Sequence, residues 1–160
     1  MENQSQKSLK QLLSDFETAM MVTHSRQKLH ARPMHIAKIE DSEIYFVTGL
    51  NSPKTAEIEK NQETTLIFQK AKVFVTVEGE AKILTDSSQI NELWSEAWRV
   101  WFPKGKEDPN ICLIVISARQ AEYWDNSGLE GLKYLFSAAS AYLTGKTPEV
   151  DSEQHGKLRL

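Results

Sequence analysis

Several extended segments of the chain are joined by turns too short to contain a helix. Residues 43–48 and 73–84 alternate apolar and polar side chains, which is the pattern of half-buried strands, and residues 64–68 are a short strand-like run of Thr, Leu, Ile and Phe. The turns at 40–42 and 70–72 are of hairpin length. Because parallel strands need long crossover connections, these turns predict antiparallel pairing.

Other segments complete the predicted architecture. Three more extended segments are expected at residues 29–39, 111–124 and 155–160, the last as a short edge strand, with a bulge or bend at Gly79. Helical spacing or capping signals predict helices at residues 8–21, 53–60, 86–98 and 128–144. Strands joined by hairpins, with helices at the periphery, predict a mainly β fold: an antiparallel barrel with flanking helices, formed by residues 1–160 as a single domain.

Composition narrows the class of protein. The 160 residues carry a formal net charge of −3 without a basic tract, which argues against nucleic-acid binding. The only cysteine, Cys112, lies in an apolar run and is expected in the core. Neither a signal peptide nor an apolar run of about 18 residues is evident, so we expect a cytoplasmic protein.

One helix start has the residues of an anion site. Ser52 is placed as the N-cap and Pro53 as the first helical residue, which leaves backbone N–H groups and a partial positive charge at this end. With Thr48, Lys54 and Arg32 nearby, it could hold a phosphate. Ordinary capping beside solvated surface cations explains the same residues, and both interpretations stay open.

Tryptophans form a second group of interest. Trp94, Trp98 and Trp101 are spaced i, i+4 and i+7, so a continuous helix would place them on one face. That face could be a core or dimer contact, or a wall against a flat aromatic ligand. Trp124 ends the long segment that begins near Ile111.

Catalytic side chains are not announced by any motif. His30 and His35 differ in parity along one strand, and the sequence contains no HxH or HExxH spacing, no G-x-S-x-G and no G-x-G-x-x-G. No metal site is therefore expected. If the protein is an enzyme, a cofactor would supply the reactivity.

Five short blocks occur in an order that resembles a known family. They are Arg32-Pro33-Met34, Phe46-Val47-Thr48 followed by Ser52-Pro53-Lys54, Val77-Glu78-Gly79-Glu80-Ala81, Trp101-Phe102-Pro103-x-Gly105, and Glu122-Tyr123-Trp124-Asp125. The chain resembles the general stress protein 26 group of the pyridoxamine 5'-phosphate oxidase-like proteins. Those proteins are FMN-binding split β-barrels, usually homodimers with the flavin at the subunit interface.

The resemblance implies roles for individual residues. Arg32 and Lys54 would neutralise the FMN phosphate, and Ser52 would donate a hydrogen bond to it. The flavin ring and ribityl chain would lie along Pro33-Met34 and the backbone of Phe46, Val47 and Thr48. Trp124 of a second subunit would contact the flavin, with Trp101 and Trp98 as weaker candidates.

Two departures limit the activity that the resemblance implies. Trp124 is followed by Asp125-Asn126-Ser127 rather than by the Arg-Leu-His-Asp-Arg block of true pyridoxamine phosphate oxidases, and Phe74 stands where a glutamine usually meets the flavin. We therefore do not expect vitamin B6 oxidation. The open hypotheses are an FMN-dependent oxidoreductase of unknown substrate, a non-catalytic flavin-binding or flavin-sensing stress protein, and an interaction module that has lost the site or binds haem or a deazaflavin.

Overall fold

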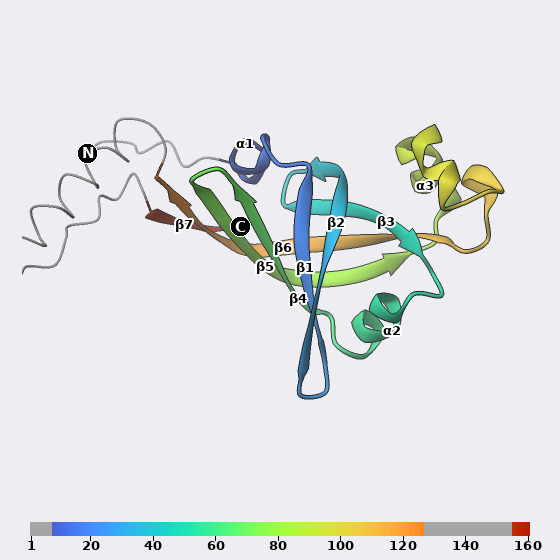
Figure 1. Cartoon of the computed structure of the whole chain (residues 1–160), viewed down its shortest axis with the longest axis horizontal. Coiled ribbons are helices and arrows are strands. Elements are labelled where there is room, and N and C mark those ends of the chain that lie inside the picture. The colour runs from blue at the N-terminus through green and yellow to red at the C-terminus, as the bar shows by residue number, and fades with distance from the viewer. Residues whose placement is uncertain (1–7, 127–154) are drawn as a thin grey trace, which may run out of the picture.

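A computed structural model describes residues 8–126 and 155–160, and these form one antiparallel sheet with short helices around it (Figure 1). The strands are β1 Thr18–Ser25, β2 Lys28–Glu40, β3 Glu43–Gly49, β4 Glu63–Lys70, β5 Val73–Leu84, β6 Ile111–Asp125 and β7 His155–Arg159. The helices are α1 Leu9–Leu13, α2 Pro53–Lys60 and α3 Ser87–Leu93, followed by 3₁₀ turns at Glu96–Val100 and Gly105–Glu107. In this part of the chain, no helix is long and apolar enough to span a membrane.

The sheet closes into a barrel through β6. The strand order is β3-β2-β1-β4-β5-β6-β7, and β3 also pairs with β6, so six strands form a closed ring and β7 lies outside it. One edge of β6 pairs with β5. The other edge pairs with β3 over residues 111–117 and with β7 over residues 120–124. The predicted mainly β fold, an antiparallel split barrel with flanking helices, is confirmed, as is the edge strand at 155–159.

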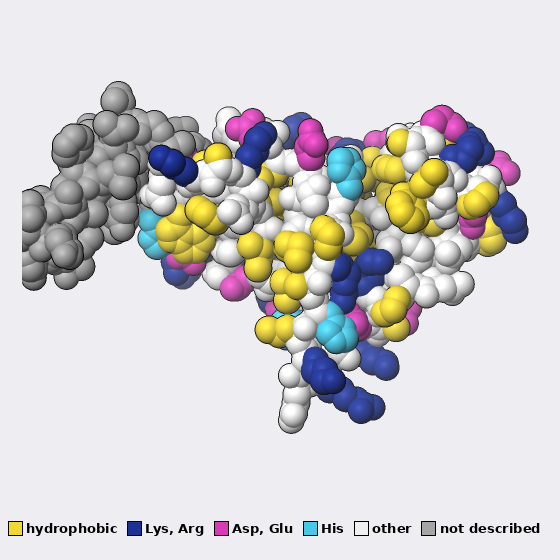
Figure 2. Space-filling view, viewed as in Figure 1, with side chains coloured by type: hydrophobic (Ala, Val, Ile, Leu, Met, Phe, Trp, Pro, Cys, Tyr) yellow, Lys and Arg dark blue, Asp and Glu magenta, His cyan; other side chains and the backbone are white. Residues whose placement is uncertain are grey.

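The outer face of the barrel carries exposed apolar side chains. Met20 of β1 and Ile67 of β4 are cross-strand partners and are 40% and 41% exposed. Phe74 of β5 is 38% exposed and pairs with Trp124 of β6. Figure 2 shows hydrophobic side chains gathered on this face, with Lys and Arg side chains beside them on the side of α2.

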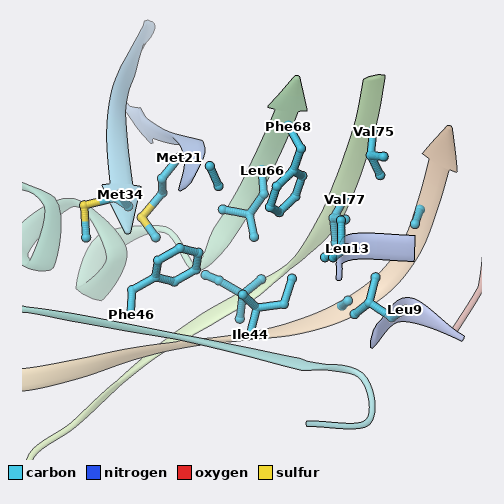
Figure 3. Packing of buried hydrophobic residues seen from close by; sticks show 14 of the residues in the cluster. Leu9, Leu13, Met21, Met34, Ile44, Phe46, Leu66, Phe68, Val75 and Val77 are labelled. Atoms are coloured by element: carbon cyan, nitrogen blue, oxygen red, sulfur yellow. The ribbon is translucent and has the colours of Figure 1, made fainter. Parts of the chain in front are cut away.

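The barrel interior is filled by alternate residues of the strands (Figure 3). Phe46, Phe68 and Leu66 have no exposed surface, and Leu9 and Leu13 of α1 pack into the same cluster. Each such side chain contributes roughly 1.5–3 kcal/mol by leaving water. Ser8 and Gln11 form a capping box that starts α1, because each side chain hydrogen-bonds the backbone N–H of the other residue.

The helix predicted for residues 8–21 is too long. α1 ends at Leu13, and residues from Thr18 onward belong to β1. The reason is a change of period: Ala19, Met21 and Thr23 are buried while Met20 is exposed, which is strand alternation. The predicted bulge at Gly79 is confirmed, because the β5–β6 register shifts there and a side chain would clash with the Ser117 carbonyl.

The helix predicted from Asp86 to Trp98 is also too long. Asp86 caps α3 as expected, but Trp94 has ψ 133° and ends the helix. Trp94 and Trp98 still meet edge to face at 6.0 Å, whereas Trp101 is 76% exposed and the three do not share a helical face. The helix predicted at 128–144 lies outside the described residues, and the single-domain assignment of residues 1–160 stays a prediction.

Candidate functional site

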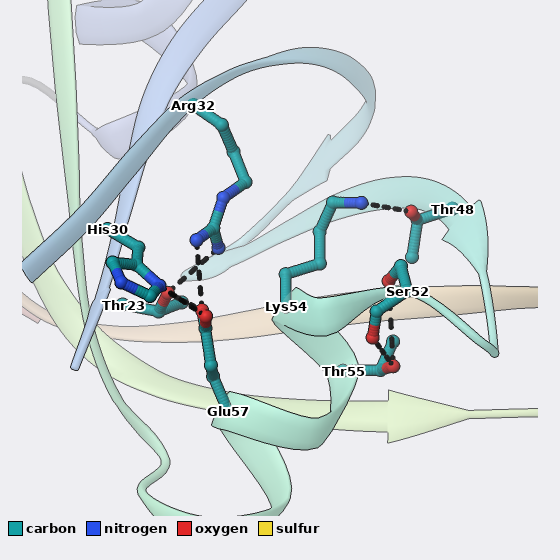
Figure 4. A network of polar contacts seen from close by, with 8 residues as sticks. All are labelled: Thr23, His30, Arg32, Thr48, Ser52, Lys54, Thr55 and Glu57. Carbon is teal, nitrogen blue, oxygen red and sulfur yellow. Dashed lines mark hydrogen bonds and ion pairs between the residues drawn. The ribbon is translucent and has the colours of Figure 1, made fainter. Parts of the chain in front are cut away.

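Four secondary-structure elements bring polar side chains together beside the start of α2 (Figure 4). Arg32 extends from β2 and Lys54 from the first turn of α2. Thr48, near the end of β3, lies above Lys54, and Glu57 of α2 faces β1 and β2. The predicted Ser52 N-cap and Pro53 helix start are confirmed, so the local sequence fixes where these side chains emerge.

Arg32 is part of an ionic network centred on the nearly buried carboxylate of Glu57. Its guanidinium donates to Thr23 Oγ1 at 2.8 Å and to Glu57 Oε2 at 2.9 Å. Thr23 Oγ1 donates to the same carboxylate at 2.5 Å, and His30 Nδ1 lies 2.5 Å from Glu57 Oε1. The Glu57 side chain is 9% exposed. A buried carboxylate is stable only when it is paired and hydrogen-bonded, and Glu57 meets both conditions.

The network controls the ionisation of Glu57. Burial alone would raise the pKa of this carboxyl, but the hydrogen bonds from Thr23, His30 and Arg32, together with the positive charge of Arg32, outweigh it and lower the pKa to about 2. Glu57 is therefore charged throughout the physiological range. It offsets one positive charge of the site.

Lys54 has a different environment. Its ammonium donates to Thr48 Oγ1 at 2.8 Å, and among the described residues no carboxylate lies within ion-pair distance of it. Burial, followed by the nearby positive charge of Arg32, lowers the pKa of Lys54 below its usual value of 10.5. Arg32, Lys54 and Glu57 together carry one net positive charge, and an anion beside Lys54 would relieve the repulsion between the two cations.

Ser52 caps α2 through its backbone position, not through its side chain. Its hydroxyl makes no capping hydrogen bond and lies 3.5 Å from Thr55 Oγ1. The Thr55 hydroxyl instead bonds the carbonyl of Leu50 at 2.7 Å. The hydroxyl of Ser52 is therefore not engaged by the helix backbone that it caps.

The other predicted contact residues are spread over the barrel. Met34 and Phe46 point into the core, so their side chains are 8% and 0% exposed. Pro33 is exposed and pairs with Met20, and half-buried Val47 packs on the smaller apolar cluster near α3. Of these four residues, only Pro33 is exposed.

Trp124 lies far from Lys54 within one chain. The register pairs Thr48 with Cys112, and Trp124 is twelve residues further along β6, or about 40 Å at roughly 3.3 Å per residue. Its ring stacks on His155, with centroids 5.1 Å apart and an interplanar angle of 8°. The structure thus brings Arg32, Thr48, Ser52 and Lys54 together and leaves Trp124 and Trp101 elsewhere.

Sequence reasoning missed Thr23, His30 and Glu57. A signal was present for two of them. Thr23 continues the inward alternation of Ala19 and Met21, so a buried hydroxyl that needs a partner could have been expected. His30 shares the parity of Arg32 and therefore the same face of β2. No local pattern marks Glu57 as buried among the charged residues of α2.

Comparisons with known proteins agree with this fold. The family model described as pyridoxamine 5'-phosphate oxidase like matches residues 4–149. General stress protein 26 from Bacillus anthracis str. Sterne is 28% identical, with a TM-score of 0.64, over 70% of this chain and 87% of that one. The general stress FMN/FAD binding protein from Xanthomonas citri is 26% identical, with a TM-score of 0.65, over 73% and 85%.

A third structure extends the likeness of fold along more of the chain. A protein described as a general stress protein 26 from Jannaschia sp. CCS1 is 21% identical, with a TM-score of 0.68, over 93% of this chain and 94% of that one. No curated protein matches the sequence. The family model covers most of the residues, and the chain therefore belongs to the pyridoxamine 5'-phosphate oxidase like family.

Proposed function

We propose that this protein binds FMN through the Arg32–Lys54 site and acts as a flavin-dependent oxidoreductase of the general stress type. The observation that carries the proposal is the Lys54 ammonium, which is partly buried beside a guanidinium without a carboxylate of its own in the described chain. The family membership and the FMN/FAD binding of the Xanthomonas citri relative support a flavin.

The charges of the site fit a phosphate monoester. Arg32 has five N–H donors, and its described hydrogen bonds use one on each terminal nitrogen. Lys54, the Ser52 hydroxyl and the amides that begin α2 lie beside it. Glu57 offsets only one of the two positive charges, so a surplus is left for a terminal phosphate such as that of FMN.

The remaining contacts would orient the ring. We propose that it lies along Pro33-Met34 and the backbone of Phe46, Val47 and Thr48, because these residues lie on neighbouring strands next to the cation pair. When bound, the flavin supplies hydride or electron transfer, and the protein contributes binding, orientation and exclusion of water. The chain lacks the Arg-Leu-His-Asp-Arg block after Trp124, so we do not propose pyridoxamine phosphate as the substrate.

A second copy of the chain would complete the site. Trp124 lies twelve residues along β6 from the residue that pairs with Thr48, so we propose that the Trp124 that shelters the flavin belongs to the second copy. The exposed apolar face around Met20, Ile67 and Phe74 would be covered in a homodimer. Trp101, which is 76% exposed, is a further candidate for this contact.

The visible spectrum of the purified protein tests the flavin proposal. We expect a yellow protein, or a colourless one that takes up FMN and is stabilised by a few kcal/mol at about a hundredfold excess over the dissociation constant. A colourless protein whose melting temperature ignores FMN contradicts it. Oxidation of a reduced nicotinamide by the holoprotein favours the enzyme, and tight FMN without turnover favours the flavin-sensing alternative.

Sedimentation of the holoprotein tests the dimer. We expect twice the 18.2 kDa mass of one chain. Ile67→Lys should shift the protein toward monomer, because it places a charge in the apolar face, whereas Lys82→Glu, at an exposed position eight residues further along β5 than Phe74, should not. A monomer that holds FMN as tightly as the dimer argues against the shared site.

A further inference from the structure

We propose that Lys54 is an acylation site: in the flavin-free protein its amine takes the acyl group of a small acyl phosphate whose phosphoryl group binds beside Arg32. This inference rests on the proposed function to the extent that the phosphoryl group would occupy the place of the FMN phosphate. It assigns to the site a covalent chemistry and a class of reagent, and it predicts that the modification removes the charge on which flavin binding depends.

The geometry around Lys54 differs from that of an ordinary surface lysine. Its only described hydrogen bond goes to a neutral hydroxyl, Thr48 Oγ1 at 2.8 Å. Lys38 provides the contrast within the same chain, because its ammonium lies 3.0 Å from carboxylate oxygens of both Glu40 and Glu92. Two carboxylates favour the protonated form of the Lys38 amine, whereas Lys54 has none within this distance among residues 8–126 and 155–160.

The surroundings of the two lysines shift their pKa values in opposite directions, in agreement with these contacts. Lys54 is faced by Arg32 and Glu57, and by the buried thiol of Cys112. Burial and the guanidinium lower the pKa of Lys54, while Glu40 and Glu92 raise the pKa of Lys38. Since only the neutral amine is a nucleophile, a lysine desolvated beside another cation is the more reactive one.

Arg32 supplies the second requirement, which is a place for the reagent. An acyl phosphate carries its anionic group one oxygen away from the electrophilic carbonyl, so anchoring the phosphoryl group near Arg32 brings the carbonyl carbon to the adjacent amine (Figure 4). The nitrogen lone pair forms the C–N bond, the C–O bond to phosphate breaks, and inorganic phosphate leaves with the amine proton. The product is a neutral amide, and no oxidant or reductant is needed.

Site-resolved mass spectrometry of the flavin-free full chain treated with acetyl phosphate tests this inference. We expect the initial rate at Lys54 to exceed that at Lys38 at least tenfold. Inorganic phosphate or FMN should slow acetylation of Lys54 and leave Lys38 unchanged. Equal rates at the two lysines, or a Lys54 rate that added phosphate does not alter, would overturn the proposal.

Arg32→Met tests whether binding of the phosphoryl group beside Arg32, and not only the reactivity of the amine, determines the rate at Lys54. For each protein we compare the rate of Lys54 acetylation by acetyl phosphate with the rate by acetic anhydride, which has no phosphoryl group. We expect this ratio of rates to be at least fivefold lower in the variant than in the native protein. An equal loss with both reagents overturns the role of Arg32, and circular dichroism verifies that the variant is folded. FMN titration distinguishes the two proposals. Tight FMN binding with an unreactive Lys54 contradicts only the acylation proposal, and selective acetylation of Lys54 in a protein that does not bind FMN contradicts only the flavin proposal.

Discussion

Two cations that face the same space are held in opposite ways. Arg32 is paired with a nearly buried carboxylate and a hydroxyl, so its position is part of the architecture of the barrel. Lys54, at the start of α2, has only the Thr48 hydroxyl among the described residues. The difference indicates that Arg32 contributes to folding as well as to binding, whereas Lys54 is available to a ligand.

Glu57→Gln should produce the largest loss of stability. It removes the charge that neutralises Arg32 and weakens three hydrogen bonds, which should cost about 2–3 kcal/mol and lower the melting temperature by roughly 5–10 °C. Glu59→Gln on the exposed side of the same helix should stay within about 0.5 kcal/mol. Equal effects of the two changes would remove the basis for treating the Arg32 network as structural.

The same variant carries a pH signature. The pKa of Glu57 is about 2 in the folded protein, below its ordinary value of 4.5, so the folded state binds this proton less tightly than the unfolded state. Its stabilising contribution is complete above about pH 4.5 and is lost as the pH falls toward 2. The difference in unfolding free energy between the native protein and Glu57→Gln should therefore shrink over this window.

Methionine substitutions at the two cations should separate binding from folding. Arg32→Met and Lys54→Met should each weaken FMN by about 1.5–3 kcal/mol, because each removes a charge-assisted contact. Only Arg32→Met should lower the melting temperature of the flavin-free protein, since it leaves Glu57 without its guanidinium. Lys54→Met should leave it unchanged or higher. If neither variant alters FMN affinity in a fluorescence titration, the phosphate assignment is wrong.

Thr48→Val should have the smallest effect. The Lys54 ammonium would lose its described acceptor, and FMN affinity should fall by about 0.5–1.5 kcal/mol. Thr48→Ser keeps the hydroxyl and should restore most of the affinity. A Ser variant as weak as the Val variant would indicate that packing of the methyl group matters, because Thr48 is only 7% exposed.

The strands were predictable because one face of each strand packs in the core and the other faces water. Alternation located β3 and β5 closely, and hairpin-length turns specified that β2 pairs with β3 and β4 with β5. The predicted helix lengths were wrong where the residues fit both the helical and the strand periodicity. Ala19 and Met20 fit the helical spacing that begins at Leu9, yet only Ala19 is buried, and the ψ angle of Trp94 ends α3.

The site was predictable in part for a related reason. Capping and charge signals near Ser52 and Lys54 are local, so the sequence contains them in one stretch. The partner of Arg32 is twenty-five residues away on another element, and the burial of Glu57 follows from the way α2 packs against β1 and β5. Long-range pairing of this kind is a property of the closed barrel and has no signature within a short window.

The divided edge of β6 has a consequence for handling this protein. Beyond residue 118 the barrel neighbour β3 has ended, and five residues of β7 cover the backbone N–H and C=O groups of residues 120–124. If β7 were displaced, for example by a fusion joined after Leu160, that stretch would become an open template for strand addition by another molecule. Strand β7 thus covers a stretch of β6 backbone that β3 does not reach.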